Sequence, residues 1–366
     1  YTGAHCERVP ELAIMLAEAA GEEREGPLAE FGFTTREEWR EFRIGAWLHD
    51  CGKVVTPEYV VDKATKLETI YNRIHEIRMR FEVLLRDARI AMLERVAAGQ
   101  PEAEAEADYE AEKARLRDDY AFIAQCNLGG EFMEPQEIER LETLAKRSWT
   151  RNFDNRLGLA HDELGRYSKT PRPLPVTEPL LADRSEHVMP RDGGMHSRYQ
   201  DLGFKVEIPK HLYNLGELHN LTIKRGTLTP EERFKINEHI IQTIIMLEQL
   251  PFPRHLAQVP EIAGAHHETM VGTGYPRGLK KEEMSLPARA MAIADIFEAL
   301  TASDRPYKKA KTLSESIRIM SFMRNDQHID PDLFDLFLRS GVYQAYADRY
   351  LEPDQVDEVD ITQYLN

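Results

Sequence analysis

The sequence predicts an all-α protein, because three kinds of helix signal recur along its 366 residues. Apolar side chains return every three or four positions in residues 3–20, as on one face of a helix. Residues 70–91 keep a heptad-like apolar seam between charged positions. Thr35 and Thr229 each precede a glutamate by three residues, which is a helix-start pattern. We therefore expect a helical bundle into which a coiled-coil-like helical hairpin is inserted.

The composition limits the classes of partner and compartment. A net charge of −16 argues against duplex nucleic acid as a partner, because binding its phosphate backbone needs a basic surface. Three widely spaced cysteines favour a reduced compartment over a disulfide framework, so we expect this fragment to be cytoplasmic. No apolar run approaches the ~18 residues of a membrane span. Because the chain starts at Tyr1 inside an apparent helix, we also expect a missing N-terminal sensory domain, which would be the part that anchors a full protein to a membrane.

Two helices are expected in the first 65 residues. The first covers residues 3–20 and places His5 on its apolar face. The second covers residues 35–51 and ends with the adjacent pair His49-Asp50. Gly52 is well placed to end this helix in a left-handed conformation, with Lys53 directly beyond it.

Residues 66–214 are expected to form an insertion of a different character. After the apolar seam, the segment 99–101 breaks the helix, and further helices are expected over 102–123 and 135–149. Residues 168–200 are rich in proline and glycine, which predicts a loop. The helices are expected to pack on themselves or on a twin chain, which suggests a homodimer through residues 66–150.

The compact helical pattern returns near residue 223. A helix that starts at Thr229 carries His239, and a helix over 260–268 ends at His266-His267. A glycine-rich loop follows at 272–278, and Asp295 lies in an apolar helix after Pro287. A last helix is expected to stop near residue 341, before an acidic tail.

Seven polar side chains stand on these otherwise apolar helices. Burying so many imidazoles and carboxylates is costly unless they pair or bind metal, and mixed nitrogen and oxygen ligation suits iron, manganese, zinc, cobalt or nickel. Two metals bridged by a carboxylate would clamp a phosphate. Adjacent helical residues diverge by roughly one hundred degrees, so one of a pair suits a single metal while its neighbour bridges two. The seven are His5, His49, Asp50, His239, His266, His267 and Asp295.

The order of these motifs resembles a known family. His5, the His49-Asp50 pair and the late Asp295 are similar to the HD phosphohydrolase superfamily. The chain also resembles the HD-GYP subfamily of cyclic di-GMP phosphodiesterases, which belongs to this superfamily. The resemblance lies in His239, His266-His267, Gly272-Thr273-Gly274-Tyr275-Pro276 and Arg305-Pro306-Tyr307-Lys308. The resemblance implies a catalytic HD-domain helical bundle made of residues 1–65 and 215–340, an inserted segment 66–214 and a tail 341–366.

The resemblance also implies a reaction and residue roles. Cyclic di-GMP would be hydrolysed to pGpG, to GMP or to both by a metal-bridging hydroxide. Two divalent ions, iron or manganese with zinc, cobalt and nickel as alternatives, would be held by the seven side chains. One ion would be bound by His5, His49, Asp50 and Asp295, and the other by Asp50, which bridges the two, with His239, His266 and His267. Lys53 would act with Asp50 in catalysis by contacting the scissile phosphate, while Tyr275, Arg305 and Lys308 would bind substrate.

Two departures from the subfamily pattern leave alternatives open. Tyr1 stands where members with three metals carry a glutamate, which favours two metals. Val271 replaces the usual aspartate before the glycine-rich loop, which puts substrate fit in question. The alternatives are a weakly active cyclic-dinucleotide-binding module, a phosphodiesterase for another cyclic dinucleotide such as cyclic GMP-AMP, and a phosphohydrolase for a nucleotide monophosphate or alarmone. The loop and the paired histidines weigh against the last.

Overall fold

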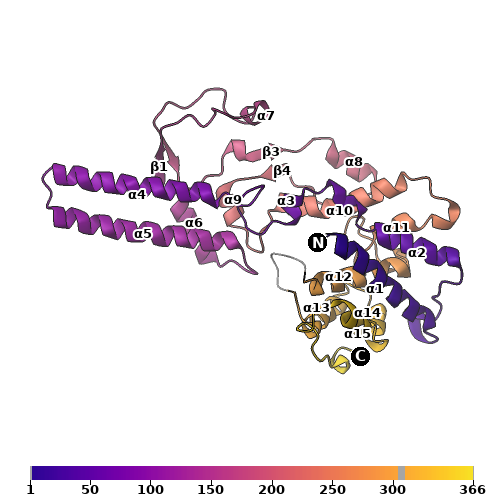
Figure 1. Cartoon of the computed structure of the whole chain (residues 1–366). Helices are drawn as coiled ribbons and strands as arrows, with labels where there is room; N and C mark the ends of the chain where they lie inside the picture. Colours follow the sequence, from indigo (N-terminus) through magenta and orange to yellow (C-terminus); the bar gives the residue numbers. More distant parts are fainter. Residues whose placement is uncertain (1, 304–309, 366) are drawn as a thin grey trace. The chain divides into compact units, whose positions relative to one another are not determined.

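The computed structural model describes residues 2–303 and 310–365 of the chain, and its elements are almost all helices (Figure 1). The predicted all-α class is confirmed, with two small two-stranded sheets added. The chain divides into two compact units, and each is described by itself. Unit 1 consists of residues 1–57, 194–208 and 235–366, and unit 2 consists of residues 58–193 and 209–234.

Unit 1 is a bundle of helices around one apolar core. Its N-terminal helix α1 packs against α2, α12, α14 and α15, and α11 packs against α2 and α12. The helices with most of their length in unit 1 are α1 (Thr2–Glu22), α2 (Arg36–Leu48), α8 (Met195–Asp201), α10 (Pro230–Glu248), α11 (Val259–Gly264), α12 (Leu286–Thr301), α13 (Leu313–Asn325), α14 (Pro331–Arg339) and α15 (Val342–Tyr350). Short 3-10 turns lie at Gly26–Leu28, Cys51–Val55, Arg254–Leu256, Lys281–Glu283 and Ile361–Gln363.

Local sequence signals set the starts of the two helices that lead to the candidate site. The Thr35 side chain accepts a hydrogen bond from the Glu38 amide, and the Glu38 carboxylate accepts one from the Thr35 amide. Thr229 and Glu232 make the same reciprocal pair at the start of α10. Both predicted capping boxes are therefore present, and each satisfies amide groups that the first turn of a helix leaves without partners.

The C-terminal part of unit 1 differs from the predicted tail. Gly341 adopts a left-handed conformation with φ of 73°, and α15 follows it directly. Tyr346 of α15 is 1% exposed, and its ring lies 5.6 Å from that of Phe297 in α12. Burying such a side chain stabilises a fold by about 1.5–3 kcal/mol. Residues 342–350 thus belong to the core of unit 1, because Val342, Tyr343, Tyr346 and Ala347 give them a continuous apolar face.

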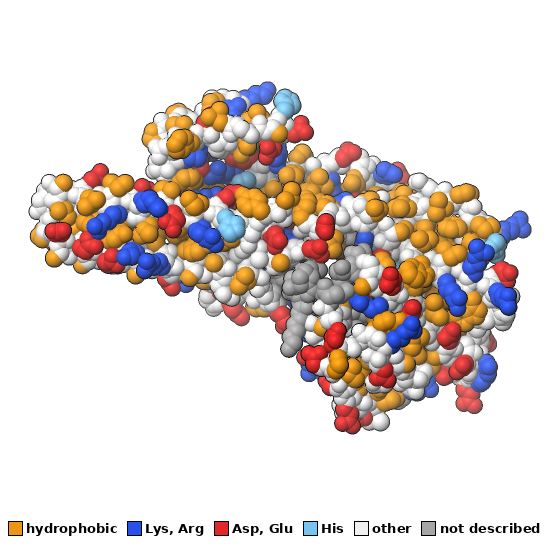
Figure 2. All heavy atoms as spheres, in the orientation of Figure 1, with side chains coloured by type: hydrophobic (Ala, Val, Ile, Leu, Met, Phe, Trp, Pro, Cys, Tyr) orange, Lys and Arg blue, Asp and Glu red, His pale blue; other side chains and the backbone are white. Residues whose placement is uncertain are grey.

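Unit 2 is built on a long antiparallel helical hairpin. Helices α4 (Ile74–Ala97) and α5 (Glu102–Leu128) are joined at the predicted break, and acidic, basic and hydrophobic side chains mingle on the hairpin surface (Figures 1 and 2). The seam predicted from the sequence supplies buried Ile74, Ile77 and Phe81. The remaining helices are α3 (Glu58–Val61), α6 (Pro135–Ala145), α7 (His161–Leu164) and α9 (Glu217–Leu221).

Two short sheets stand in unit 2 where the sequence predicted a helix end and a loop. Strand β1 (Ser148–Arg151) pairs antiparallel with β2 (Val176–Pro179), and β3 (Val188–Pro190) pairs with β4 (His211–Asn214) across a bulge. The helix predicted to reach residue 149 ends at Ala145, because residues 148–151 pair with β2 instead. A 3-10 turn at Ser185–His187 precedes β3.

An ion pair ties the hairpin to the rest of unit 2. The Arg80 guanidinium donates to both carboxylate oxygens of Glu217 at 2.7 Å, and the Ala182 amide donates to the same carboxylate at 3.0 Å. Burial would raise the pKa of Glu217, but Arg80 and this amide hold it below its usual value. Both charges are thus satisfied in the fold, which a buried ion pair requires.

Two expectations concern the cysteines and membrane-spanning helices. Cys6, Cys51 and Cys126 are free. Among the described residues, no helix has the length and apolar character needed to cross a membrane.

Candidate metal centre

Seven side chains that the sequence singled out converge in unit 1. His5 comes from α1, His49 and Asp50 follow the last turn of α2, and His239 lies within α10. His266 and His267 were expected inside a helix but lie just beyond the end of α11, where the chain leaves the helical path. Asp295 lies within α12. The structure therefore brings five separate segments of the sequence to one place.

The histidines and Asp295 form two groups of three. The candidate ligand atoms of His5, His49 and Asp295 all lie within 4.8 Å of one another. The same holds for the second group, which consists of His239, His266 and His267. Three donors at this spacing are enough to hold a divalent metal ion with positions left open for water or substrate.

Asp50 lies between the two groups and reaches both. Its Oδ2 atom is 3.1 Å from His5 Nε2 and 3.4 Å from His49 Nε2. Its Oδ1 atom is 3.2 Å from His239 Nε2. One carboxylate thus directs one oxygen to each triad, which is the arrangement that a bridging ligand between two metals needs.

Hydrogen bonds to backbone carbonyls fix three of the imidazole rings. The Nδ1 atoms of His49, His239 and His266 donate to carbonyl oxygens three residues earlier, at 2.6, 2.6 and 2.9 Å. A carbonyl oxygen can only accept, so Nδ1 carries the proton and Nε2 presents a lone pair. The Nε2 atoms of His49 and His266 are buried and have no hydrogen-bond partner in the described part of the chain. Metal ions would fit these donors.

The protonation states also suit metal ligands. Burial lowers the pKa of His266 to about 3 and holds the pKa of His267 well below its usual value, so both rings are neutral. Burial would raise the pKa of Asp50 and Asp295, but neighbouring histidines hold both below the usual range, so both are carboxylates. Metal ions bind neutral imidazoles and ionised carboxylates.

The His5 ring lies in a strongly negative environment that would attract a cation. Burial would lower the pKa of this ring, but hydrogen bonds with Asp295, Asp50 and Glu298 raise it to about 11. Its Nε2 atom is 3.1 Å from a carboxylate oxygen of Asp50 and 3.1 Å from one of Asp295, so the ring nitrogen faces two negative charges. A divalent cation at this point would neutralise the same negative charge.

Two further carboxylates support the site, and sequence reasoning assigned them no role. Glu298 is fully buried in α12, and its carboxylate binds His5 Nδ1 and the Arg8 guanidinium. Glu268 accepts hydrogen bonds from the backbone amides of residues 277, 278 and 279, at 2.7, 3.1 and 2.9 Å. Their closeness in the sequence to the predicted metal ligands could have indicated a role. Glu298 lies three residues after Asp295, and Glu268 follows the paired histidines directly.

Gly52 has a different role from the one predicted. The prediction that it ends α2 in a left-handed conformation is wrong, since it lies in the 3-10 turn Cys51–Val55 without a positive φ. Its lack of a side chain matters instead. A Cβ atom there would lie 1.9 Å from the carbonyl oxygen of His239 and 2.5 Å from the amide nitrogen of Thr243. Gly52 therefore lets the end of α2 touch the backbone of α10.

The glycine-rich loop carries Tyr275 next to the second triad. The Tyr275 ring stacks on the His267 ring, with centroids 4.9 Å apart and planes 14° from parallel. Gly272 and Gly278 have φ values of 77° and 63°, as expected for tight turns. A Cβ atom on Gly274 would lie 2.5 Å from the Glu268 Cα atom. The glycines thus allow the loop to fold closely onto the histidine pair.

The remaining predicted residues have the following positions. Lys53 Nζ lies 2.5 Å from Asp50 Oδ2 at the edge of the site. Burial would lower the pKa of Lys53, but the charges of Asp50 and Asp295 raise it, so the side chain is cationic. Val271 is 44% exposed. Arg305, Lys308 and Tyr1 lie outside the described residues.

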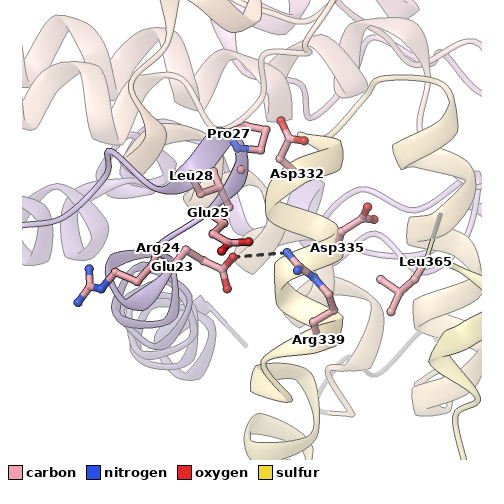
Figure 3. Close-up of a pocket in the computed structure, with 10 residues that line it drawn as sticks. Glu23, Arg24, Glu25, Pro27, Leu28, Asp332, Asp335, Arg339 and Leu365 are labelled. Carbon is pink, nitrogen blue, oxygen red and sulfur yellow. Dashed lines mark ion pairs between the residues drawn. The ribbon is translucent and has the colours of Figure 1, made fainter.

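Unit 1 also has a separate surface pocket of about 620 Å³ beside α14 (Figure 3). Its charged groups are largely paired. Arg339 lies 3.7 Å from Glu23, Asp332 is 2.7 Å from Lys281, and Asp335 is 2.9 Å from Arg324. Its residues do not form one of the ligand groups described above, so we do not take this pocket as the functional site.

Comparison with known proteins agrees with the geometry. Residues 175–333 match the family model described as HD domain, and the chain therefore carries an HD domain. The predicted relationship to the HD superfamily is confirmed. The matched segment includes the second triad and Asp295, whereas His5, His49 and Asp50 precede it.

The matching curated proteins are bacterial phosphodiesterases of cyclic dinucleotides. A 3'3'-cGAMP-specific phosphodiesterase of Vibrio cholerae is 37% identical over 151 residues, which are 39% of this chain and 34% of that protein. A cyclic di-GMP phosphodiesterase of Pseudomonas aeruginosa is 34% identical over 177 residues, 48% of this chain and 37% of that protein. A cyclic di-GMP phosphodiesterase of Thermotoga maritima is 33% identical over 138 residues, 37% of each chain. The alignments thus span about a third of the length of these relatives, whose names are consistent with the HD-GYP subfamily.

Proposed function

We propose that this chain is a metal-dependent phosphodiesterase that hydrolyses cyclic di-GMP to pGpG, to GMP or to both. The observation that carries the proposal is the Asp50 carboxylate, which directs one oxygen toward each of two histidine-containing triads. The names of the relatives supply the substrate class.

Two divalent ions would be held by the seven side chains. His5, His49 and Asp295 would hold one ion, His239, His266 and His267 would hold the other, and Asp50 would bind both. Iron or manganese is the proposed metal, with zinc, cobalt and nickel as alternatives, because the donors are mixed nitrogen and oxygen. When bound, the two ions supply Lewis acidity for an in-line displacement at phosphorus.

The chain's own groups would orient and neutralise the substrate. The Lys53 ammonium group stands at the edge of the site, where it would stabilise negative charge that develops on the phosphate. The stacked Tyr275 ring would offer a flat surface and a hydroxyl group to the nucleotide. Arg305 and Lys308 are further proposed substrate contacts. Glu298 would hold the His5 ring in place through Nδ1.

Two observations support alternative functions that the experiment below must distinguish. One relative is named as specific for 3'3'-cGAMP, so that dinucleotide is a second candidate substrate. Val271 stands before the loop that carries Tyr275, at a position where the resemblance to the HD-GYP subfamily leads us to expect an aspartate. Its presence would suit a module that binds a cyclic dinucleotide but turns it over poorly.

The deciding experiment uses the full chain, loaded anaerobically with iron(II) or manganese(II). Cyclic di-GMP and 3'3'-cGAMP are offered separately, the products are identified by mass spectrometry, and bound metal is measured for each sample. We expect linear dinucleotide or mononucleotide from at least one substrate, and no product after chelation or with Asp50→Asn. If every metal gives binding without product, the enzyme proposal fails and the binding module replaces it.

The hairpin of unit 2 suggests how two chains would associate. Met79, Ile90 and Leu93 are more than half exposed along α4, although they are large and apolar. We propose a homodimer through residues 66–150 that covers this face, in a cytoplasmic compartment that would keep the three cysteines reduced. Substituting all three side chains with serine should convert a dimer to a monomer in sedimentation experiments, and a wild-type monomer would contradict the proposal.

A further inference from the structure

Unit 2 contains a small pocket of about 100 Å³ that is lined by arginines. The pocket lies beside strands β1 and β2 and is formed largely by residues 151–186. Four arginines line it: Arg151, Arg156, Arg172 and Arg184. Such a concentration of positive charge is unexpected in a chain whose net charge is −16.

The carboxylates in the wall neutralise only part of this charge. The buried Glu178 carboxylate is shared by Arg151, at 3.0 Å, and by Arg184. The other acidic residue of the wall, Glu186, lies 3.9 Å from the Arg184 guanidinium. These four residues form one charge network with a net charge close to zero.

Arg156 and Arg172 stand outside this network. Neither makes an ion pair with another residue that the structure describes. The Arg156 Nε atom is buried and has no hydrogen-bond partner among those residues, while its terminal nitrogen donates weakly to the Lys169 carbonyl at 3.4 Å. A buried donor without an acceptor is unfavourable, so its presence beside a pocket points to a ligand that accepts hydrogen bonds.

We propose that this pocket binds a dianionic phosphate group, either as free phosphate or as the terminal phosphate of a nucleotide. Two guanidinium groups without carboxylate partners match the charge of such a group, and their planar forks match its oxygen geometry. The hydroxyl groups of Tyr167, Ser168 and Thr170 also line the pocket and add donors.

The size of the pocket selects the part of a ligand that enters it. A water molecule occupies about 30 Å³ in the liquid, so the pocket has room for about three waters. That space accommodates one phosphate group, and a whole cyclic dinucleotide would extend out of it. The proposal is independent of the phosphodiesterase activity, because every residue that carries it belongs to unit 2.

The test is calorimetric titration of the metal-loaded full chain with three probes: inorganic phosphate, GMP and guanosine. We expect phosphate and GMP to bind and guanosine not to bind. Arg172→Ala and Arg156→Ala should each weaken phosphate binding at least about tenfold, which corresponds to about 1.4 kcal/mol. Arg117→Ala is the matched control, because Arg117 is an exposed arginine of α5 outside the pocket. It should leave affinity unchanged.

The two nucleotide probes distinguish the sources of the phosphate. If GMP binds more tightly than phosphate and both lose affinity in Arg172→Ala, the terminal phosphate of a nucleotide is the ligand. Equal affinities assign the pocket to free phosphate. Circular dichroism and thermal unfolding check the fold of each variant, and Arg172→Ala decides the matter if Arg156→Ala unfolds, since Arg172 is exposed.

Three results would overturn the proposal. Guanosine binding as tightly as GMP would show that the base, and not the phosphate, is recognised. Phosphate binding that Asp50→Asn abolishes and both arginine variants keep would place the anion at the metal centre. An absence of phosphate binding by the wild-type chain would leave the pocket without its proposed ligand.

Discussion

Replacing Gly52 with alanine tests whether the contact between α2 and α10 assembles the metal centre. The added Cβ atom would lie 1.9 Å from the His239 carbonyl oxygen, and real Cβ contacts essentially never fall below 3.0 Å. The two backbones must therefore separate by about 1 Å, a misplacement that can slow catalysis by about 10²-fold. The same movement widens the 3.2 Å distance between Asp50 Oδ1 and His239 Nε2, on which bridging depends.

The separation also strains a hydrogen-bonded clamp. The Gly52 amide donates to Thr243 Oγ1 at 2.9 Å, and that hydroxyl donates to the His49 carbonyl at 3.2 Å. Overpacking a close contact typically costs about 1–3 kcal/mol of unfolding free energy, and the two strained hydrogen bonds contribute about 1 kcal/mol each. The backbone conformation itself adds no strain, because Gly52 lacks a positive φ. The expected loss is therefore steric.

The assay compares bound metal, thermal unfolding and turnover of cyclic di-GMP. Gly52→Ala should bind less metal, unfold at a lower temperature and lose about 10²-fold in turnover. Gly32→Ala is the control, because a Cβ atom there meets nothing within 4 Å and its φ is not positive. Unchanged metal content and turnover in Gly52→Ala would refute the reasoning, since the close approach would then be irrelevant to the site.

Four further substitutions have distinct expected outcomes. Lys53→Ala should keep both metals and lose about 10²-fold in kcat, and a parallel loss of metal would show a ligand-positioning role instead. Glu268→Ala should raise KM for the dinucleotide at unchanged metal content, because three loop amides, including that of Arg277, lose their acceptor; an unchanged KM would contradict this. Arg80→Ala should destabilise unit 2 by about 3–5 kcal/mol in urea unfolding, because the buried Glu217 carboxylate loses its partner. Folding lowers the pKa of Glu217 from 4.5, so the stabilisation from its carboxylate is present above that pH and is lost as the pH falls through the folded-state pKa. Glu217→Gln should therefore flatten the dependence of the unfolding free energy on acid pH. A profile as steep as that of the wild-type chain would contradict the assignment.

Much of the candidate site could be predicted because each side chain carries a local anomaly. His239 and Asp295 are polar residues on apolar helices, and His49-Asp50 follows a helix whose start is marked by a capping box. These signals depend on residues within a few positions of one another, where helical spacing fixes which side chains share a face.

The supporting residues could not be predicted in the same way. Glu268 and Glu298 look like ordinary acidic residues until the fold shows the loop amides and the His5 ring that they hold. The strands β1 and β2 were missed because their pairing joins residues 148–151 to 176–179, and neither segment is long enough to show an alternating pattern. Helix α15 was missed because an acidic end of the chain masked its short apolar face.

The sequence by itself therefore determined the helical class, the starts of α2 and α10, and the residue types gathered at the centre. The family resemblance implied that Asp50 bridges two metals, and the tertiary structure supplied the distances from its two oxygens to the two triads. Only the tertiary structure decided that Gly52 is needed for space rather than for a left-handed turn. The physical reason is the range of the interactions. Capping and periodicity act within one helical turn, whereas the contact of Gly52 with Thr243 joins residues 191 positions apart and exists only once the helices have packed.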